Sequence, residues 1–236
     1  MASRQPRTKS SSRAGMLRRC AVFAGIASRT LSRLAESSIE RHMGPNQILV
    51  TQSESFPYLG VVLDGSVIAS FLTADGRDHL LYEINPPETF AEIPMIDEHG
   101  ALSTLASGPD GALVVLIPKT IVESGCRSDA KLSYQIARVT AARARTLARS
   151  VGTLAFASTA RRVARVVRST LTDGAVGRVD APEALRALSQ GQIALRAGTV
   201  RVVAARTLHA LAESGAIELE RGRIVAVDTA ILAQWV

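Results

Sequence analysis

Apolar positions near the C-terminus recur at helical intervals, in two groups separated by a glycine. The first group is Ile193, Ala194 and Ala197, and the second is Val203, Ala204, Leu208 and Leu211. Spacings of three and four residues predict two short helices that meet at Gly198. Ser189 and Gln192 have the spacing of a capping box at the start of the first helix, and Gly215 supplies a stop for the second.

The spacing of apolar residues changes after these two helices. Residues 217–220 alternate apolar and acidic side chains, residues 224–227 form a second apolar run, and Arg221-Gly222 lies between them. This pattern predicts a β-hairpin. A further helix is expected over residues 160–171, after Ser158-Thr159. Two helices around a glycine turn, followed by a hairpin, are typical of a winged helix-turn-helix domain, to which we assign residues 157–236.

The middle of the chain has a different pattern, in which short apolar runs alternate with turn residues. The runs are residues 48–50, 59–63, 67–72, 79–82 and 113–117. Strands at this spacing indicate an all-β barrel or roll. Asp64-Gly65 and Asp75-Gly76 predict hairpins, and Gly108-Pro109-Asp110-Gly111 predicts another turn. We therefore expect an α+β protein with an N-terminal antiparallel, jelly-roll-like β-roll over residues 16–127, including a short helical region at 17–37.

Residues 128–156 predict one long helix. Its apolar stripe consists of Leu132, Ile136, Val139, Leu147, Val151 and Leu154. A helix of this length spans roughly 43 Å, more than one small domain can cover. We expect a second copy of the chain to pack along the stripe as a coiled coil. The alternative is that the stripe packs only on its own roll.

Charge is unevenly distributed along the chain, whose net charge is +7. Residues 1–40 carry 8 basic and 2 acidic groups, residues 41–130 carry 4 and 12, and residues 159–236 carry 11 and 7. An acidic middle and a basic remainder indicate two modules with different partners, and a polyanion would bind the basic one. Residues 1–15 are basic and low in complexity, and we expect a disordered tail.

The sequence contains no group of residues with the spacing of an enzyme active site. The histidines of the middle region, His42, His79 and His99, are widely spaced, so we expect no metal site and no catalytic activity. Cys20 and Cys126 form neither a disulfide framework nor a CxxC motif. No run approaches the roughly 18 apolar residues of a membrane span, and no signal segment is apparent, so we expect a cytoplasmic protein without a membrane partner.

Basic residues on the second helix of the winged domain are candidates for DNA contact. For a helix over residues 199–214 entering a major groove, we expect base contacts from Thr199, Arg201, Val202 and Arg206. Phosphate contacts are expected from Arg161, Ser189, Gln190, His209, Arg221 and Arg223. Two alternatives are a merely solvated basic face and a winged helix that binds protein instead of DNA.

The order of roll, long helix and winged helix-turn-helix resembles the Crp–Fnr superfamily of bacterial transcription regulators. The likeness is closest at residues 151–156, 188–217 and 220–224. It implies a homodimeric, sequence-specific regulator of double-stranded DNA that turns its DNA-binding domains about Ala157, with RNA polymerase as a candidate partner. Family members commonly have Arg-Glu where this chain has Arg201-Val202. Because valine cannot accept a hydrogen bond from cytosine, the target sequence should differ from the common family half-site.

The resemblance also places an effector pocket in the roll. Residues 87–92, Pro-Glu-Thr-Phe-Ala-Glu, are similar to the family's phosphate-binding cassette, with Ala91 in place of glycine and Glu92 retained. Ser103, Thr104 and Arg143 complete the candidate pocket, and Arg143 is expected to reach Glu92. The stretch 99–105 contains no arginine to neutralise a cyclic phosphate, so we expect an effector other than cyclic AMP. Haem, another small effector and a ligand-independent regulator stay open as alternatives.

Overall fold

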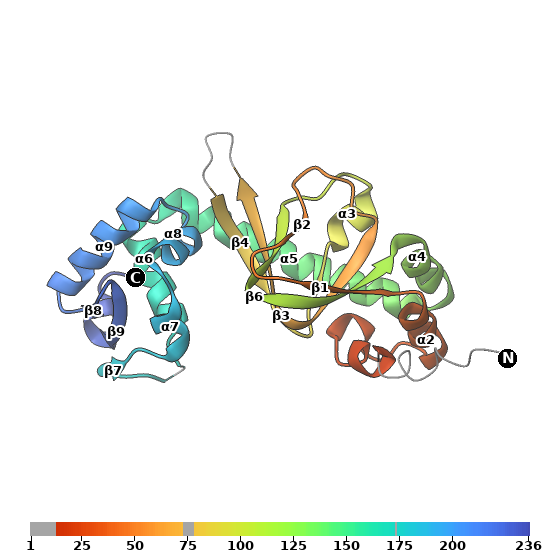
Figure 1. Ribbon diagram of the computed structural model, residues 1–236, viewed down its shortest axis with the longest axis horizontal. Helices are drawn as coiled ribbons and strands as arrows, with labels where there is room; N and C mark the ends of the chain where they lie inside the picture. The colour runs from red at the N-terminus through yellow and green to blue at the C-terminus, as the bar shows by residue number, and fades with distance from the viewer. Residues whose placement is uncertain (1–12, 73–77, 173) are drawn as a thin grey trace. The chain divides into compact units, whose positions relative to one another are not determined.

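A computed structural model describes residues 13–72, 78–172 and 174–236 of the chain (Figure 1). The chain forms two compact units. The first consists of Met1–Phe71 and Tyr82–Thr146, and the second of Leu72–Leu81 and Leu147–Val236. In the described ranges, every helix falls short of the length or apolarity that a membrane crossing requires.

The first unit is built on an antiparallel β-roll. Its strands are β1 (Ile39–Met43), β2 (Ile48–Val50), β3 (Tyr58–Leu72), β4 (Asp78–Ile84), β5 (Thr89–Phe90) and β6 (Thr104–Pro118). The sheet order is β1-β6-β3-β4, with β2 paired to β6 and β5 paired to β3. The pairings of β6 with β1, β2 and β3 are antiparallel. The expected α+β class with a roll is therefore confirmed.

Two expected turns lie inside long strands. Asp64-Gly65 does not reverse the chain, because β3 continues through it and pairs with β6 on both sides, with shifts of register at this point. Gly65 adopts a φ of 66°, and a glycine with positive φ serves a bulge as well as a hairpin. Residues 108–111 likewise belong to β6. The expected hairpin at Asp75-Gly76 lies outside the described residues.

Helices cover one end of the roll. They are η1 (Ala21–Phe23), α2 (Ser28–Glu36), α3 (Glu92–Asp97) and α4 (Lys119–Ser128). The core between them and the sheet includes the fully buried Phe23, Leu31, Leu34, Leu59, Ile117 and Leu132. Residues 13–17 are helical, which corrects the expected tail over its last three residues. Arg13 is fixed there because Nη1 donates a hydrogen bond to the Ser38 carbonyl oxygen at 2.8 Å.

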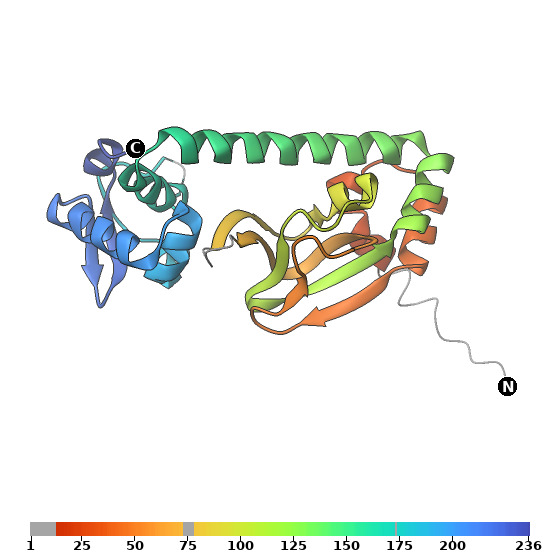
Figure 2. The same cartoon turned by 90° about the horizontal axis from the view of Figure 1, so that it is seen from above.

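Helix α5 (Ala130–Phe156) is long and unbroken (Figure 2). It begins at residue 130 instead of 128, because Ser128 ends α4 and Asp129 is extended. Leu132 and Ile136 are buried in the core of the roll. They are therefore unavailable to a second chain, and the expected dimer stripe is wrong at these two positions. Val139 and Leu147 are half-buried, whereas Val151 and Leu154 are exposed.

The second unit contains α6 (Thr159–Ser169), β7 (Arg178–Asp180), α7 (Glu183–Ala187), α8 (Gln190–Ala197), α9 (Arg201–Glu213), β8 (Ile217–Glu220), β9 (Arg223–Asp228) and α10 (Thr229–Ala233). The hairpin expected from the sequence is β8 and β9, and β7 joins it to make a three-stranded sheet in the order β7-β9-β8. The core contains Val163, Val167, Leu185, Ile193, Leu208, Leu211 and Val227. This arrangement places α9 across the surface of a small packed domain.

Candidate nucleic-acid interface

Helix α8, which leads into the turn before α9, is capped at both ends. Ser189 and Gln192 form the expected capping box at the start of α8. At its end, Gly198 adopts a left-handed conformation with φ 62° and ψ 49°. The Gly198 amide donates to the Leu195 carbonyl oxygen at 3.3 Å and the Thr199 amide to that of Ala194 at 3.0 Å. These two bonds are a Schellman motif, which ends α8 sharply and starts α9 in a new direction.

Helix α9 has a buried face and an exposed face. The buried positions are Ala204, Thr207, Leu208 and Leu211, and the exposed positions are Arg201, Val202, Arg206, His209 and Glu213. At 100° per residue, the exposed positions span an arc of about 140°, and its centre lies about 140° from that of the buried arc. Val202 is 78% exposed. The structure thus brings three of the four predicted base-contacting residues onto one solvent-facing strip.

The fourth predicted base contact, Thr199, lies in the turn before α9 and is half-buried. The helix begins at Arg201, two residues later than expected, because Thr199 takes part in the Schellman motif and Val200 is extended. Thr199 is therefore adjacent to the strip rather than part of the helix.

Arg162 supports the turn from the neighbouring helix α6. Its Nε donates to the Ala197 carbonyl oxygen at 2.8 Å, and its Nη2 donates to that of Gly198 at 3.2 Å. Nη1 donates to the Ala157 carbonyl oxygen at 2.9 Å. Arg161 and Arg168 on the same helix are exposed, whereas the side chain of Arg162 is directed to the turn. No spacing rule identifies a guanidinium that binds backbone carbonyl groups far along the chain.

The tip of the wing is a tight two-residue turn. Arg221 has a φ of 47° and Gly222 a φ of 77°, as a type I′ hairpin turn requires. Arg221 and Arg223 are both exposed. Arg223 Nη1 also donates to the Ala187 carbonyl oxygen, which connects the wing to the end of α7. The wing therefore presents two cations at its tip.

The other residues predicted to contact phosphate differ in their exposure and in their hydrogen bonds within the chain. Arg161 and His209 are exposed, and the Arg161 Nε donates to the Val236 carbonyl oxygen. Ser189 and Gln190 are half-buried. The Ser189 hydroxyl accepts from the Gln192 amide at 3.2 Å as part of the capping box.

The predicted effector-pocket residues do not all line one pocket. Ala91, Glu92 and Ser103 line a cavity of only about 20 Å³. Glu92 is buried and accepts a hydrogen bond from the Thr89 hydroxyl. Thr104 lies in β6, where its hydroxyl accepts from the Gln52 amide at 3.2 Å.

Arg143 lines a separate cleft. The expected contact between Arg143 and Glu92 is wrong, because the guanidinium binds other residues. Its Nη2 donates to the Thr89 carbonyl oxygen at 2.7 Å and lies 3.7 Å from Glu88 Oε2. The guanidinium also lies 4.7 Å from the centre of the Tyr82 ring. Burial raises the pKa of Tyr82, and the positive charge of Arg143 partly opposes that rise.

Comparisons with known proteins agree with this geometry. Residues 161–235 match the sequence model of the Crp-like helix-turn-helix domain. The Cyclic AMP receptor protein of Thermus thermophilus is 26% identical over 214 residues, covering 90% of this chain and 95% of that protein. The CRP-like cAMP-activated global transcriptional regulator of Mycobacterium tuberculosis is 23% identical, covering 93% of this chain and 97% of that protein. Nearly the whole chain is thus similar to regulators of the Crp–Fnr superfamily, and residues 161–235 match the Crp-like helix-turn-helix domain.

Solved structures share the fold of this chain. The c-di-GMP responsive global regulator CLP of Xanthomonas campestris has a TM-score of 0.72 at 19% identity, covering 86% of this chain and 100% of that one. A Crp/Fnr-family transcriptional regulator from Eubacterium rectale has a TM-score of 0.71 at 17% identity, with coverages of 91% and 96%. The protein is a Crp-like transcription regulator with a helix-turn-helix domain.

The cassette at residues 87–92 keeps an unusual backbone at Ala91, where its sequence departs from the cassette that it resembles. Ala91 adopts a φ of 63° and a ψ of 28°, in the left-handed region that favours the family's glycine. The substitution therefore preserves the course of the chain into α3 and adds a buried methyl group beside the small cavity.

Proposed function

We propose that this regulator binds double-stranded DNA as a homodimer and reads base sequence with α9. The observation that carries the proposal is the exposed strip of Arg201, Val202 and Arg206 on a helix that starts at a fixed turn. Arginine pairs with guanine through two hydrogen bonds, and an apolar side chain contacts the methyl group of thymine. Arg201 and Arg206 would therefore read guanine, and Val202 would favour thymine.

Phosphate contacts would come from the residues around this strip. Arg161, His209, Arg221 and Arg223 are exposed on α6, on α9 and at the wing tip. Backbone contacts set the register of a protein on the duplex without specifying its sequence. Ser189 and Gln190, at the start of α8, would add polar contacts there. Contact with RNA polymerase and a cytoplasmic location stay predictions.

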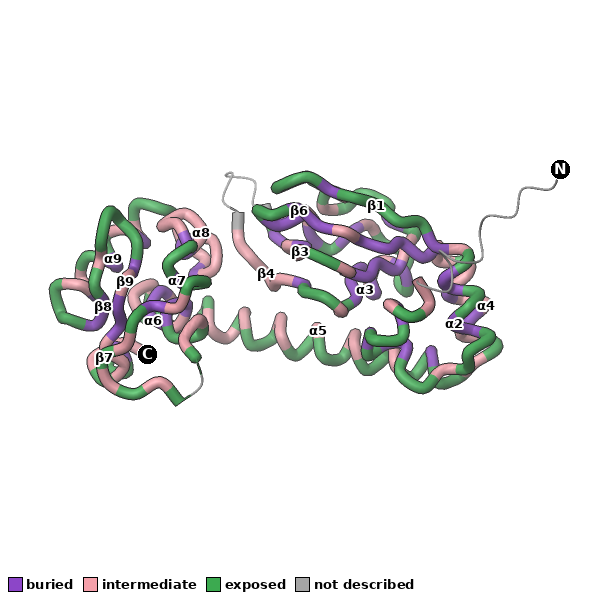
Figure 3. Tube along the Cα trace, turned by 60° about the horizontal axis from the view of Figure 1, so that its bottom comes forward, coloured by how far each residue is buried: buried purple, intermediate pink, exposed green. Residues whose placement is uncertain are grey.

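A stripe on α5 supports the homodimer. Tyr134, Ala137, Ala141, Ala144, Ala148, Val151 and Ala155 are all exposed and follow one another at alternating intervals of three and four residues. We call this set the seam. Figure 3 shows exposed positions recurring along α5. A 3-4 repeat is the pattern of helices that pair in a coiled coil, and small residues allow close approach. At 100° per residue, the seam is rotated by roughly 130° from the buried Leu132 and Ile136.

The dimer test is a charge placed in the seam. Ala144→Glu would bring two carboxylates together at the pairing face and should raise the dimer dissociation constant at least tenfold in analytical ultracentrifugation. Arg149→Glu, at an exposed position of α5 roughly 110° from the centre of the seam, is the control and should leave the constant within threefold. Equal effects of the two substitutions would exclude this seam.

The proposed effector is a molecule other than cyclic AMP. A cavity of about 20 Å³ at Ala91, Glu92 and Ser103 holds about one water molecule. Residues 99–105 contribute no arginine to neutralise a phosphate. Calorimetry with cyclic AMP should give no heat of binding, whereas saturable binding with micromolar affinity would contradict this part of the proposal.

DNA binding itself is tested by its dependence on salt. Neutralisation of phosphates releases counterions, so the logarithm of the association constant for a random duplex should fall linearly with the logarithm of salt concentration. A winged helix that binds protein would give no such slope. Fluorescence anisotropy of a labelled 30-base-pair duplex measures it, and absence of binding at low ionic strength would contradict the proposal.

A further inference from the structure

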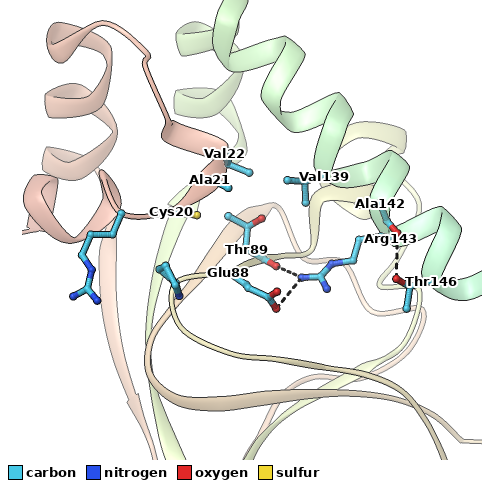
Figure 4. Close-up of a pocket in the computed structure, with 11 residues that line it drawn as sticks. Cys20, Ala21, Val22, Glu88, Thr89, Val139, Ala142, Arg143 and Thr146 are labelled. Atoms are coloured by element: carbon cyan, nitrogen blue, oxygen red, sulfur yellow. Dashed lines mark hydrogen bonds and ion pairs between the residues drawn. The ribbon is translucent and has the colours of Figure 1, made fainter. Parts of the chain in front are cut away.

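A cleft of about 360 Å³ lies on the first unit between three segments that are distant in sequence (Figure 4). Residues 19–22 form one wall, residues 87–89 the second and α5 the third. It is separate from the small cavity at Glu92, and the two share no lining residue. Its volume lies within the range of roughly 300–1,000 Å³ that is typical of sites for small molecules.

Arg143 is an incompletely bonded cation in this cleft. Its side chain is only 13% exposed, and it reaches from α5 to Glu88 and Thr89. The Nε–H is buried without an acceptor among the residues that the structure describes. A buried charged donor without a partner is costly, so a ligand that supplies an acceptor would bind favourably.

Glu88 is a weak partner for this cation. Its carboxylate lies 3.7 Å from Arg143 Nη2 and its side chain is 50% exposed. An exposed carboxylate can turn into solvent at little cost, because surface ion pairs contribute about 0–1 kcal/mol. An incoming anion could therefore replace Glu88 beside the guanidinium.

The remaining walls determine what kind of anion fits. Ala21, Val22, Pro87, Val139 and Ala142 line the cleft with apolar groups. Glu88 would repel a dianion more strongly than a monoanion, and the planar fork of arginine matches a carboxylate. Arg19 also lines the cleft but is exposed to solvent. The cleft thus combines one buried site for a single negative charge with an apolar pocket for the rest of the molecule.

We propose that this cleft binds a small organic carboxylate, with Arg143 holding the carboxylate group and the apolar walls holding its hydrocarbon part. Val139, Ala142, Arg143 and Thr146 face the cleft from α5. At 100° per residue, their centre lies about 180° around the helix from the seam. A ligand would press on the helix directly opposite its pairing face and so alter dimerisation, a consequence that rests on the proposed dimer.

The test uses three carboxylates with different hydrocarbon parts: 4-phenylbutanoate, octanoate and indole-3-acetate. Calorimetry with the full chain compares each with its uncharged primary amide and with inorganic phosphate. At least one carboxylate should bind at least tenfold more tightly than its amide and than phosphate. Failure of all three at millimolar concentration, equal binding of an amide, or tighter binding of phosphate would overturn the proposal.

Three variants locate the binding. Arg143→Gln should weaken the carboxylate at least tenfold, while Arg145→Gln, an exposed arginine on the same helix, should bind like the wild type. Ala142→Phe fills the cleft and keeps Arg143, so it should abolish binding even if Arg143→Gln fails to fold. Unchanged binding in Ala142→Phe would overturn the assignment to this cleft.

The effect on pairing is measured separately. The bound carboxylate should shift the dimer dissociation constant at least threefold in the wild type and leave that of Arg143→Gln unchanged. Binding without such a shift would overturn the regulatory consequence, and it would leave both the site and DNA binding intact.

Discussion

Arg162 and Ala197 are joined by a hydrogen bond of 2.8 Å from the guanidinium Nε to the backbone carbonyl oxygen. The bond connects α6 to the last residue of α8, immediately before the turn that starts α9. Arg162 is thus a positioning residue for the proposed recognition helix, because the direction of α9 depends on the turn that it supports.

Arg162→Met should loosen this turn while keeping the aliphatic stem of the side chain. Loss of charged hydrogen bonds to backbone carbonyl groups should cost about 1.5–3 kcal/mol of local stability. Hydrogen exchange of the α8 and α9 amides, followed by mass spectrometry, should accelerate at least tenfold. Arg168→Met removes the same charge from an exposed position of α6 and should leave the exchange unchanged. Equal acceleration in both variants would mean that charge, not the turn contacts, is responsible.

Val202→Glu should change which bases the protein prefers. The side chain is 78% exposed, so the substitution should not affect folding. A carboxylate accepts a hydrogen bond from the cytosine amino group, and a good contact of this kind gives about 1–3 kcal/mol of discrimination. Selection from a randomised duplex library should replace thymine by cytosine at one position of each half-site. An unchanged motif would show that Val202 does not face the bases.

Gly60→Ala should destabilise the roll. A Cβ atom at this position would lie 2.0 Å from the Phe90 ring, which is fully buried. Overpacking of this kind costs about 1–3 kcal/mol. Chemical denaturation of the full chain, followed by the fluorescence of the tyrosines, measures the change. Gly44→Ala meets only the end of the Gln47 side chain, at 3.9 Å, and should change the stability by less than about 0.5 kcal/mol.

Cys20 should make the protein less stable at high pH. Burial raises the pKa of the Cys20 thiol from 9.0 to about 11. The folded state therefore binds the proton more tightly, so its stabilising effect is complete below pH 9 and is lost as pH rises toward 11. Between pH 8 and pH 10.5 the free energy of unfolding should fall by about 2 kcal/mol more in the wild type than in Cys20→Ala. If the free energy of unfolding changed equally with pH in the wild type and in Cys20→Ala, the raised pKa of Cys20 would be contradicted.

The sequence predicted the parts of the fold that have strong local signals. The capping box at Ser189, the glycine turn at Gly198 and the hairpin at Arg221-Gly222 each depend on a few neighbouring residues, and the structure has all three. The hairpin predicted at Asp64-Gly65 was wrong, because a bulge and a hairpin use the same glycine conformation. Whether a strand continues is decided by its partner, here β6, which no local pattern reveals.

The candidate sites were harder to predict where they depend on long-range contacts. Leu132 and Ile136 have the spacing of a coiled-coil stripe, but the roll buries them, and the exposed seam consists mainly of alanines. Alanine gives little hydrophobic signal, so the apolar pattern included the buried Leu132 and Ile136 and, of the seam, only Val151. Arg143 was identified as a pocket residue, although its partners, Glu88 and Thr89, emerged only from the packing of α5 against the roll.

The most direct measurement of the central claim is sequencing of the duplexes that the protein selects from a randomised library. A symmetric dimer that reads DNA with α9 should select an inverted repeat with half-site centres about 10 base pairs apart. Arg201→Ala should relax the base preference at one position of each half-site, whereas Arg223→Ala should weaken binding to all sequences about equally and leave the motif unchanged. Recovery of no motif, or of the same motif with Arg201→Ala, would contradict the account.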